Sequence, residues 1–119
     1  MDTSASNVQH SLEDVSYLCR LPRMFREGTQ SAHDLVHQGR IDPRLMSFEA
    51  VKSVLGQDPE LTEEWQRWSE ERRTSSGWFF RYENGLHILG YYPRDKRVAF
   101  PDATSACAAF IIRELRSIW

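Results

Sequence analysis

The chain has little cysteine and no long apolar run. Cys19 and Cys107 are its two cysteines, and they form no CxxC pair. Isolated cysteines are typical of buried free thiols in a cytoplasmic protein, and they disfavour a disulfide or a metal pair. No apolar run approaches the ~20 residues needed to cross a bilayer. The polar start, MDTSASNVQHSLED, lacks both parts of a secretory signal, so we expect a cytoplasmic protein without membrane contact.

The charges nearly cancel. The formal net charge is -2, which is too small to indicate a nucleic acid or another strongly charged ligand. The distribution is uneven, with 9 basic and 13 acidic residues in 1–74 against 6 and 4 in 75–119. It indicates an acidic helical side and a mildly basic sheet side.

The locally recognisable motifs of enzymes are missing. There is no GxxxxGK[ST], GxGxxG, GxSxG or HExxH. His33 and His37 have the i, i+4 spacing of some zinc ligands, but no third ligand accompanies them, and we interpret them as surface histidines. Cys107 falls among apolar residues, where a thiolate would be desolvated. We therefore expect no enzymatic activity, no metal and no cofactor.

Residues 77–100, GWFFRYENGLHILGYYPRDKRVAF, predict three antiparallel strands. Asn84-Gly85 is typical of a type I′ hairpin, because both central residues of that turn need a positive φ. The first two strands then pair Glu83 with Leu86, and every pair further along the ladder follows from this one.

The second turn is predicted at Pro93–Lys96, where proline presets φ at the first turn position. It pairs Tyr92 with Arg97 and places Leu89 opposite Phe100. The two turns agree on one predominantly apolar inner face, formed by Trp78, Phe80, Tyr82, Leu89, Tyr91, Val98 and Phe100.

The opposite face of this sheet mixes apolar groups with arginines. Phe79 lies opposite Gly90, where its ring has room over the missing side chain. A helix or the N-terminal segment could partly cover this face, or it could be a docking surface rich in aromatics and arginine. Its members are Phe79, Arg81, Glu83, Leu86, Ile88, Gly90, Tyr92, Arg97 and Ala99.

Short helical segments precede the sheet. Each begins at a serine that can cap a helix and carries apolar residues at helical spacing. The segments begin at Ser11, Ser31 and Ser47, and we expect them to end at Pro22, at Gly39 in a left-handed conformation, and at Gly56.

The best-defined helix opens at Asp58-Pro59, with proline at the first helical position. Leu61, Trp65 and Trp68 form its apolar stripe at i, i+4, i+7. Arginines 72 and 73 suit its last turn, because they complement the helix dipole. We place Glu60, Glu63, Glu64, Arg67, Glu70 and Glu71 on the opposite, solvent-facing side.

A final helix closes the chain. Asp102 caps it, and a broad apolar face lets it cover the sheet. That face consists of Ala103, Ala106, Cys107, Phe110, Ile111, Leu115 and Ile118. The order of short helices, three-stranded meander and packed C-terminal helix predicts an α+β fold. We expect a flexible segment over 1–10 and a single domain over 11–119.

Helices followed by a β-hairpin also raise the alternative of a DNA-binding winged helix, with Arg72, Arg73, Arg81, Arg94, Lys96 and Arg97 as its basic cluster. The helices before the hairpin are acidic, however, and none presents a basic recognition face. This composition favours protein recognition over nucleic acid.

The runs PELTEEWQRWSEERRTSSGWFF, LGYY and FPDATSACAAFIIREL resemble small bacterial immunity proteins that accompany polymorphic or contact-delivered toxins. Many of these are single α+β domains with a Trp-containing helix, GWYF-like and GYY-like strands and an ACAxFIxxEL-like closing helix. The similarity spans about residues 31–119, mostly at core positions. Phe79-Phe80 stands where the family pattern has Tyr-Phe.

The resemblance implies a cytoplasmic, non-enzymatic inhibitor that binds a cognate toxin. The alternatives are a small regulatory module that binds protein or DNA and, after it, an unrecognised hydrolase. From the surfaces predicted above, the expected partner-binding residues are Glu60, Glu63, Glu64, Glu70 and Glu71 on the helix and Phe79, Arg81, Tyr92, Arg94 and Arg97 on the sheet.

Overall fold

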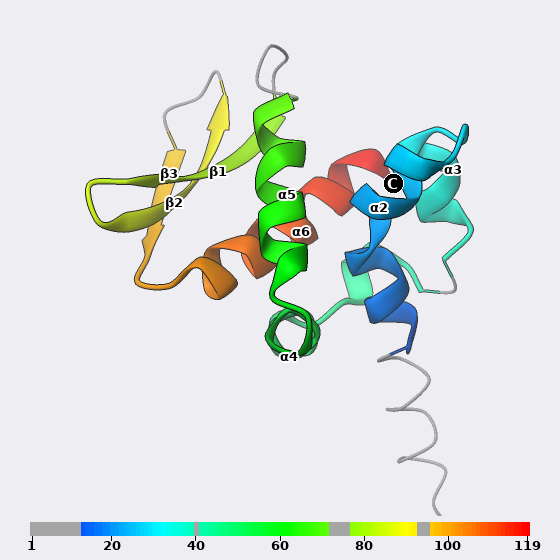
Figure 1. Cartoon of the computed structure of the whole chain (residues 1–119), viewed down its shortest axis with the longest axis horizontal. Coiled ribbons are helices and arrows are strands. Elements are labelled where there is room, and N and C mark those ends of the chain that lie inside the picture. Colours follow the sequence, from blue (N-terminus) through cyan, green and yellow to red (C-terminus); the bar gives the residue numbers. More distant parts are fainter. Residues whose placement is uncertain (1–12, 40, 72–76, 93–95) are drawn as a thin grey trace, which may run out of the picture.

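The fold is α+β, as the sequence predicts, and helix α6 runs through its middle (Figure 1). The computed structural model describes residues 13–39, 41–71, 77–92 and 96–119. Residues 13–19 are helical. The elements that follow are α2 (Leu21–Glu27), α3 (Ala32–His37), the 3-10 helix η1 (Pro43–Leu45), α4 (Phe48–Gln57), α5 (Glu60–Glu71), β1 (Gly77–Glu83), β2 (Leu86–Tyr92), β3 (Lys96–Phe100) and α6 (Ala103–Ile118).

The core forms around α6, which packs against all three strands and against α3, α4, α5 and η1. Its Phe110 is fully buried and touches an aromatic ring from each side, with centroid distances of 4.9 Å to Phe80 of β1 and 6.0 Å to Trp65 of α5. The Trp65 indole N–H is satisfied as well, because it donates a 2.7 Å hydrogen bond to the carbonyl oxygen of Cys19. Sheet, α5 and the N-terminal helix thus share one core.

The first hairpin has the predicted register. Glu83 pairs with Leu86, and the ladder continues from there to Gly77 and Tyr92. Asn84 and Gly85 have φ values of 52° and 81°, as a type I′ turn requires.

The predicted register between β2 and β3 was wrong by two residues. Leu89 pairs with Val98 instead of Phe100, and Gly90 pairs with Arg97. Six residues lie between Gly90 and its partner, two fewer than in the predicted register, and residues 93–95 of this connection lie outside the described residues. A shift by two keeps every side chain on its predicted face, because side chains alternate with a period of two. The apolar pattern alone cannot distinguish registers that differ by an even number.

Three helix ends also differ from the prediction. Pro22 does not end a helix but lies in the first turn of α2, where proline needs no N–H partner. Gly56 is inside α4, which continues to Gln57. Gly39 has no positive φ. A Cβ there would lie 3.0 Å from a methyl carbon of Leu18, so close packing, rather than a positive φ, favours glycine at this position.

The caps predicted at Ser31, Ser47 and Asp102 are confirmed. The Ser31 and Ser47 hydroxyls accept hydrogen bonds from the third residue along, at 3.1 and 3.0 Å. Asp102 accepts two bonds from Ser105, one from its N–H at 3.1 Å and one from its hydroxyl at 2.7 Å. The cap expected at Ser11 lies outside the described residues.

Candidate protein-binding surface

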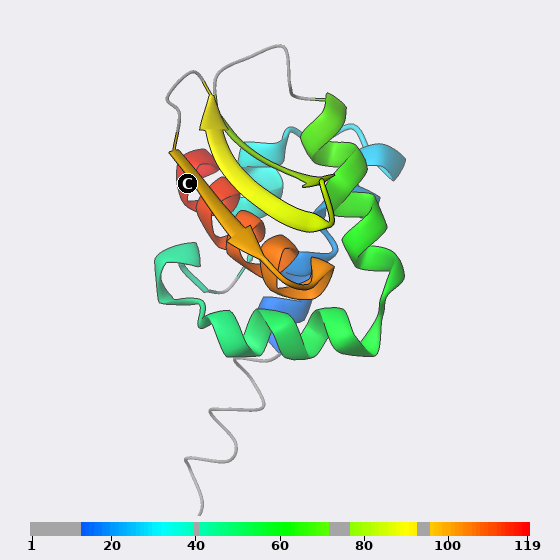
Figure 2. The ribbon, with the colours of Figure 1, turned by 90° about the vertical axis from the view of Figure 1, so that its left-hand side faces the viewer.

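The sheet has one covered and one open face. Helix α6 packs beneath the inner face, where Phe80 and Leu89 are buried. The outer face points away from α6 and toward the viewer in Figure 2, and no described helix lies over it. Tyr82 and Val98 belong to the inner face but remain 58% and 54% exposed.

The centre of the outer face is an aromatic ring held against bare backbone. The ring of Phe79 lies over Gly90, so that a Cβ on this glycine would be 2.5 Å from Phe79 Cζ. The Arg81 guanidinium carbon lies 5.3 Å from the centroid of the same ring, a cation–π distance. This confirms the predicted contact between Phe79 and Gly90.

Ion pairs continue from this centre along the outer face. Arg81 Nε lies 2.9 Å from Glu83 Oε2, and Arg97 Nη1 lies 3.6 Å from Glu83 Oε1. Glu83 thus joins two of the arginines predicted to bind a partner. Arg94 lies outside the described residues. The backbone of Tyr92 belongs to β2, but its side chain is outside the description.

The glutamates predicted on α5 do not share one exposed side. Glu60, Glu63, Glu70 and Glu71 are exposed. Glu64 is not, since its side chain is 12% exposed and forms a 2.7 Å ion pair with Arg23 of α2. Helix geometry explains the difference: at 100° per residue, Glu64 lies beside the Leu61 stripe and faces the neighbouring helix. Its predicted place on the solvent side was wrong.

Arg23 binds both Glu64 and the start of α5. Its Nη1 lies 3.0 Å from Asp58 Oδ2, and its Nη2 lies 3.8 Å from Glu60 Oε2. The hydrogen bonds to Glu64 and Asp58 raise the pKa of the Arg23 guanidinium further above its ordinary value. Part of the acidic charge of α5 is therefore neutralised inside the molecule.

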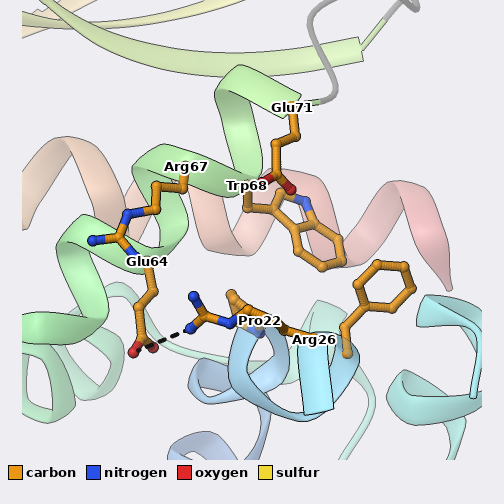
Figure 3. A pocket seen from close by; sticks show the side chains of 7 residues that line it. Pro22, Arg26, Glu64, Arg67, Trp68 and Glu71 are labelled. Atoms are coloured by element: carbon orange, nitrogen blue, oxygen red, sulfur yellow. Dashed lines mark ion pairs between the residues drawn. The ribbon is translucent and has the colours of Figure 1, made fainter. Parts of the chain in front are cut away.

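Helix α2 and the pocket that it forms with α5 were not predicted from the sequence (Figure 3). This open pocket of about 170 Å³ is lined by Pro22, Phe25, Arg26, Glu64, Arg67, Trp68 and Glu71. Phe25 packs edge-on against Trp68 at 5.2 Å between ring centroids. The available signal was LPRMFRE itself, a proline followed by apolar and basic residues at helical spacing.

His33 and His37 form part of an aromatic stack. Their ring centroids are 4.2 Å apart, and His37 stacks on Trp119 at 4.3 Å with an interplanar angle of 7°. Within the described part of the chain, no group of three His, Cys, Asp or Glu side chains could hold a metal ion.

Both cysteines are buried free thiols, as predicted. Burial raises the pKa of Cys19 to about 12. Burial, and secondarily the charge of a Cys19 thiolate, also raise the pKa of Cys107. Neither thiol has the environment of a nucleophile, because the thiolate is disfavoured at both positions.

A scan of protein-family models matched no family, and neither the search of curated proteins nor that of solved structures found a match. No helix in the described ranges is both long and apolar enough to span a membrane. The surfaces of this chain are therefore the basis for a functional proposal.

Proposed function

We propose that this chain is a non-enzymatic protein-binding inhibitor, an immunity protein that neutralises a cognate bacterial toxin by forming a tight complex. The uncovered outer face of the sheet carries the proposal. It combines an aromatic ring with two arginines, residue types that are enriched where protein partners bind.

The outer face is organised before any partner arrives. Phe79 is fixed against Gly90, and Arg81 is held by both the Phe79 ring and Glu83. Side chains that are already ordered lose less conformational entropy on binding, which favours a tight complex. Docking on this face would block the toxin by covering the surface through which it acts.

The exposed glutamates of α5 support a second contribution, which is electrostatic. Ser69 of α5 hydrogen-bonds β1, so Glu70 and Glu71, which follow it, lie near the sheet. Negative side chains beside a docking face accelerate the approach of a basic partner. We propose that Glu60, Glu63, Glu70 and Glu71 act in this way, whereas Glu64 maintains the contact with α2.

The proposal is tested by co-expressing the chain with a toxin encoded beside its gene. We expect growth to be rescued and the two proteins to co-purify. Phe79→Ala and Arg81→Ala should each raise the Kd by about tenfold or more, as substitutions at the centre of an interface do. Isothermal titration calorimetry gives the Kd, and circular dichroism checks the fold.

Arg44→Ala is the matched control, because Arg44 is another exposed arginine paired with a carboxylate, 2.6 Å from Asp42. It lies on η1, away from the sheet, and should leave the Kd unchanged. Equal effects of Arg44→Ala and Arg81→Ala would contradict a docking role for the outer face. Failure of the pair to co-purify would remove the immunity function.

A further inference from the structure

The two edges of the sheet differ in how their backbone groups are paired in the described part of the chain. The outer edge of β1 is occupied, because Phe80 N–H donates a 3.1 Å hydrogen bond to Ser69 Oγ and the Ser69 hydroxyl makes a longer contact of 3.4 Å with Phe80 O. On the other side, β3 pairs with β2 along one edge, and no strand within the described ranges pairs with its second edge. An uncovered edge is a template for another strand.

The register identifies the backbone groups on the free edge of β3. Phe80 directs its N–H and C=O toward Ser69, so its partner Leu89 directs its own toward β3. Leu89 and Val98 are therefore a hydrogen-bonded pair. The direction alternates along a strand, so Arg97 and Ala99 direct their N–H and C=O groups outward.

We propose that two copies of this chain pair through their β3 edges, antiparallel and centred on Val98, to form one six-stranded sheet. Antiparallel pairing of two identical strands generates a two-fold axis, which gives a closed dimer. The inference goes beyond the proposed function and is independent of it, because the outer face stays open in the dimer.

Three antiparallel registers place the outward-directed backbone groups of the two β3 strands opposite each other. The side chains of β3 favour the register that is centred on Val98. Centring on Arg97 would place two arginines opposite each other, and centring on Ala99 would place Pro101, which has no N–H, opposite Arg97. Centring on Val98 pairs Arg97 with Ala99 of the other copy, twice. It satisfies four backbone hydrogen bonds and opposes no like charges.

The side chains around this axis suit the same arrangement. Val98 is 54% exposed although it belongs to the inner face, and it would pack against its own copy across the axis. Arg97 leans across the sheet toward Glu83, and Ala99 is small, so neither blocks the approach of a second strand. A contact limited to one short strand is small, so we expect dissociation on dilution.

A disulfide across the axis tests both the pairing and its register. Cα atoms of directly opposite residues in a non-hydrogen-bonded pair are about 4.5 Å apart, which a disulfide can span. In a mild glutathione redox buffer, Val98→Cys should form a covalent dimer. The native thiols do not compete, since both are buried and have raised pKa values.

Ala99→Cys is the matched control. In the proposed dimer, the two copies of residue 99 are displaced from each other by two positions along the paired strands. Their Cα atoms are then about 8 Å apart, which exceeds the span of a disulfide. At ~100 μM chain, Val98→Cys should cross-link about tenfold faster than Ala99→Cys, because paired thiols have an effective concentration in the millimolar range. Equal rates, or a faster reaction of Ala99→Cys, would overturn the proposal.

Sedimentation equilibrium tests the association without a covalent bond. Ala99→Pro removes an outward N–H that makes no bond within the sheet, so the monomer should stay folded by circular dichroism. The unmodified chain should show an average mass that rises with concentration, and Ala99→Pro should remain monomeric. The dimer would be refuted if the unmodified chain is monomeric at 1 mM, or if the unmodified chain and Ala99→Pro associate equally. Toxin binding by Ala99→Pro is measured separately, so that a failure of the dimer proposal can be distinguished from a failure of the proposed function.

Discussion

At the scale of the residue, Gly90 illustrates how a missing side chain shapes a surface. Its Cα occupies the middle strand, and the Phe79 ring fills the space that a Cβ would take. The predicted pairing of these two residues followed from the Asn84-Gly85 turn alone. The register of one hairpin was therefore enough to identify the aromatic centre of the outer face.

Gly90→Ala is expected to displace the Phe79 ring and to lower the free energy of unfolding by about 1 kcal/mol, near the lower end of overpacking costs, because the ring can swing outward. In a Phe79→Ala background the same change should stabilise by about 0.5 kcal/mol, since alanine is less flexible than glycine when unfolded. Urea unfolding measures both values.

Gly56→Ala is the control for that experiment. Nothing lies within 4 Å of a Cβ added to Gly56, which is inside α4. The change should therefore stabilise by about 0.5–1 kcal/mol through helix propensity. A Gly90→Ala effect of the same sign in both backgrounds would contradict the contact with Phe79.

At the scale of the element, α6 shows local chemistry and packing in agreement. Asp102 begins the helix by accepting two bonds from Ser105, and these bonds hold the pKa of its carboxyl below the ordinary value of 3.8. A carboxyl whose pKa is lower in the folded state than in the unfolded state stabilises the folded state at pH values above the unfolded pKa. This contribution is lost as the pH falls through the lower, folded value.

Asp102→Ala should lower the free energy of unfolding by about 1 kcal/mol at pH 7, the usual cost of losing an N-cap. Asp102→Asn should cost less, because asparagine also caps. Urea unfolding at pH 7 and pH 2.5 measures both variants. The advantage of the unmodified chain over Asp102→Asn should shrink at the lower pH, where the carboxyl gains its proton. An advantage that grows on acidification would contradict the lowered pKa.

Helix α5 shows where an element-level prediction fails. Its apolar stripe was predicted correctly, since Leu61, Trp65 and Trp68 are all buried. A single charged side on α5 predicts Glu64 in solvent, and this prediction is wrong because Glu64 pairs with Arg23. The position of Glu64 depends on Arg23 of α2, and α2 was not predicted since Pro22 was interpreted as an end.

At the scale of the whole molecule, burial of the thiols reports on cooperative opening. Cys19 and Cys107 come from opposite ends of the chain and are both fully buried in the core around α6. We expect neither to react with Ellman's reagent at pH 8 under native conditions, because exposure requires the core to open. Both should react once urea unfolds the protein. Rapid native reaction of either thiol would contradict this packing.

Local chemistry explains why so much of the fold could be predicted. Caps, the Asn84-Gly85 turn and the period of the apolar residues each depend on neighbours in the chain, and they led correctly to α6, the first hairpin and the two faces of the sheet. The even-numbered shift of β3, the inward position of Glu64 and the pocket against α2 depend on which elements meet in space. Short-range patterns carry no information about which elements pack together, so only the tertiary structure decided these three features.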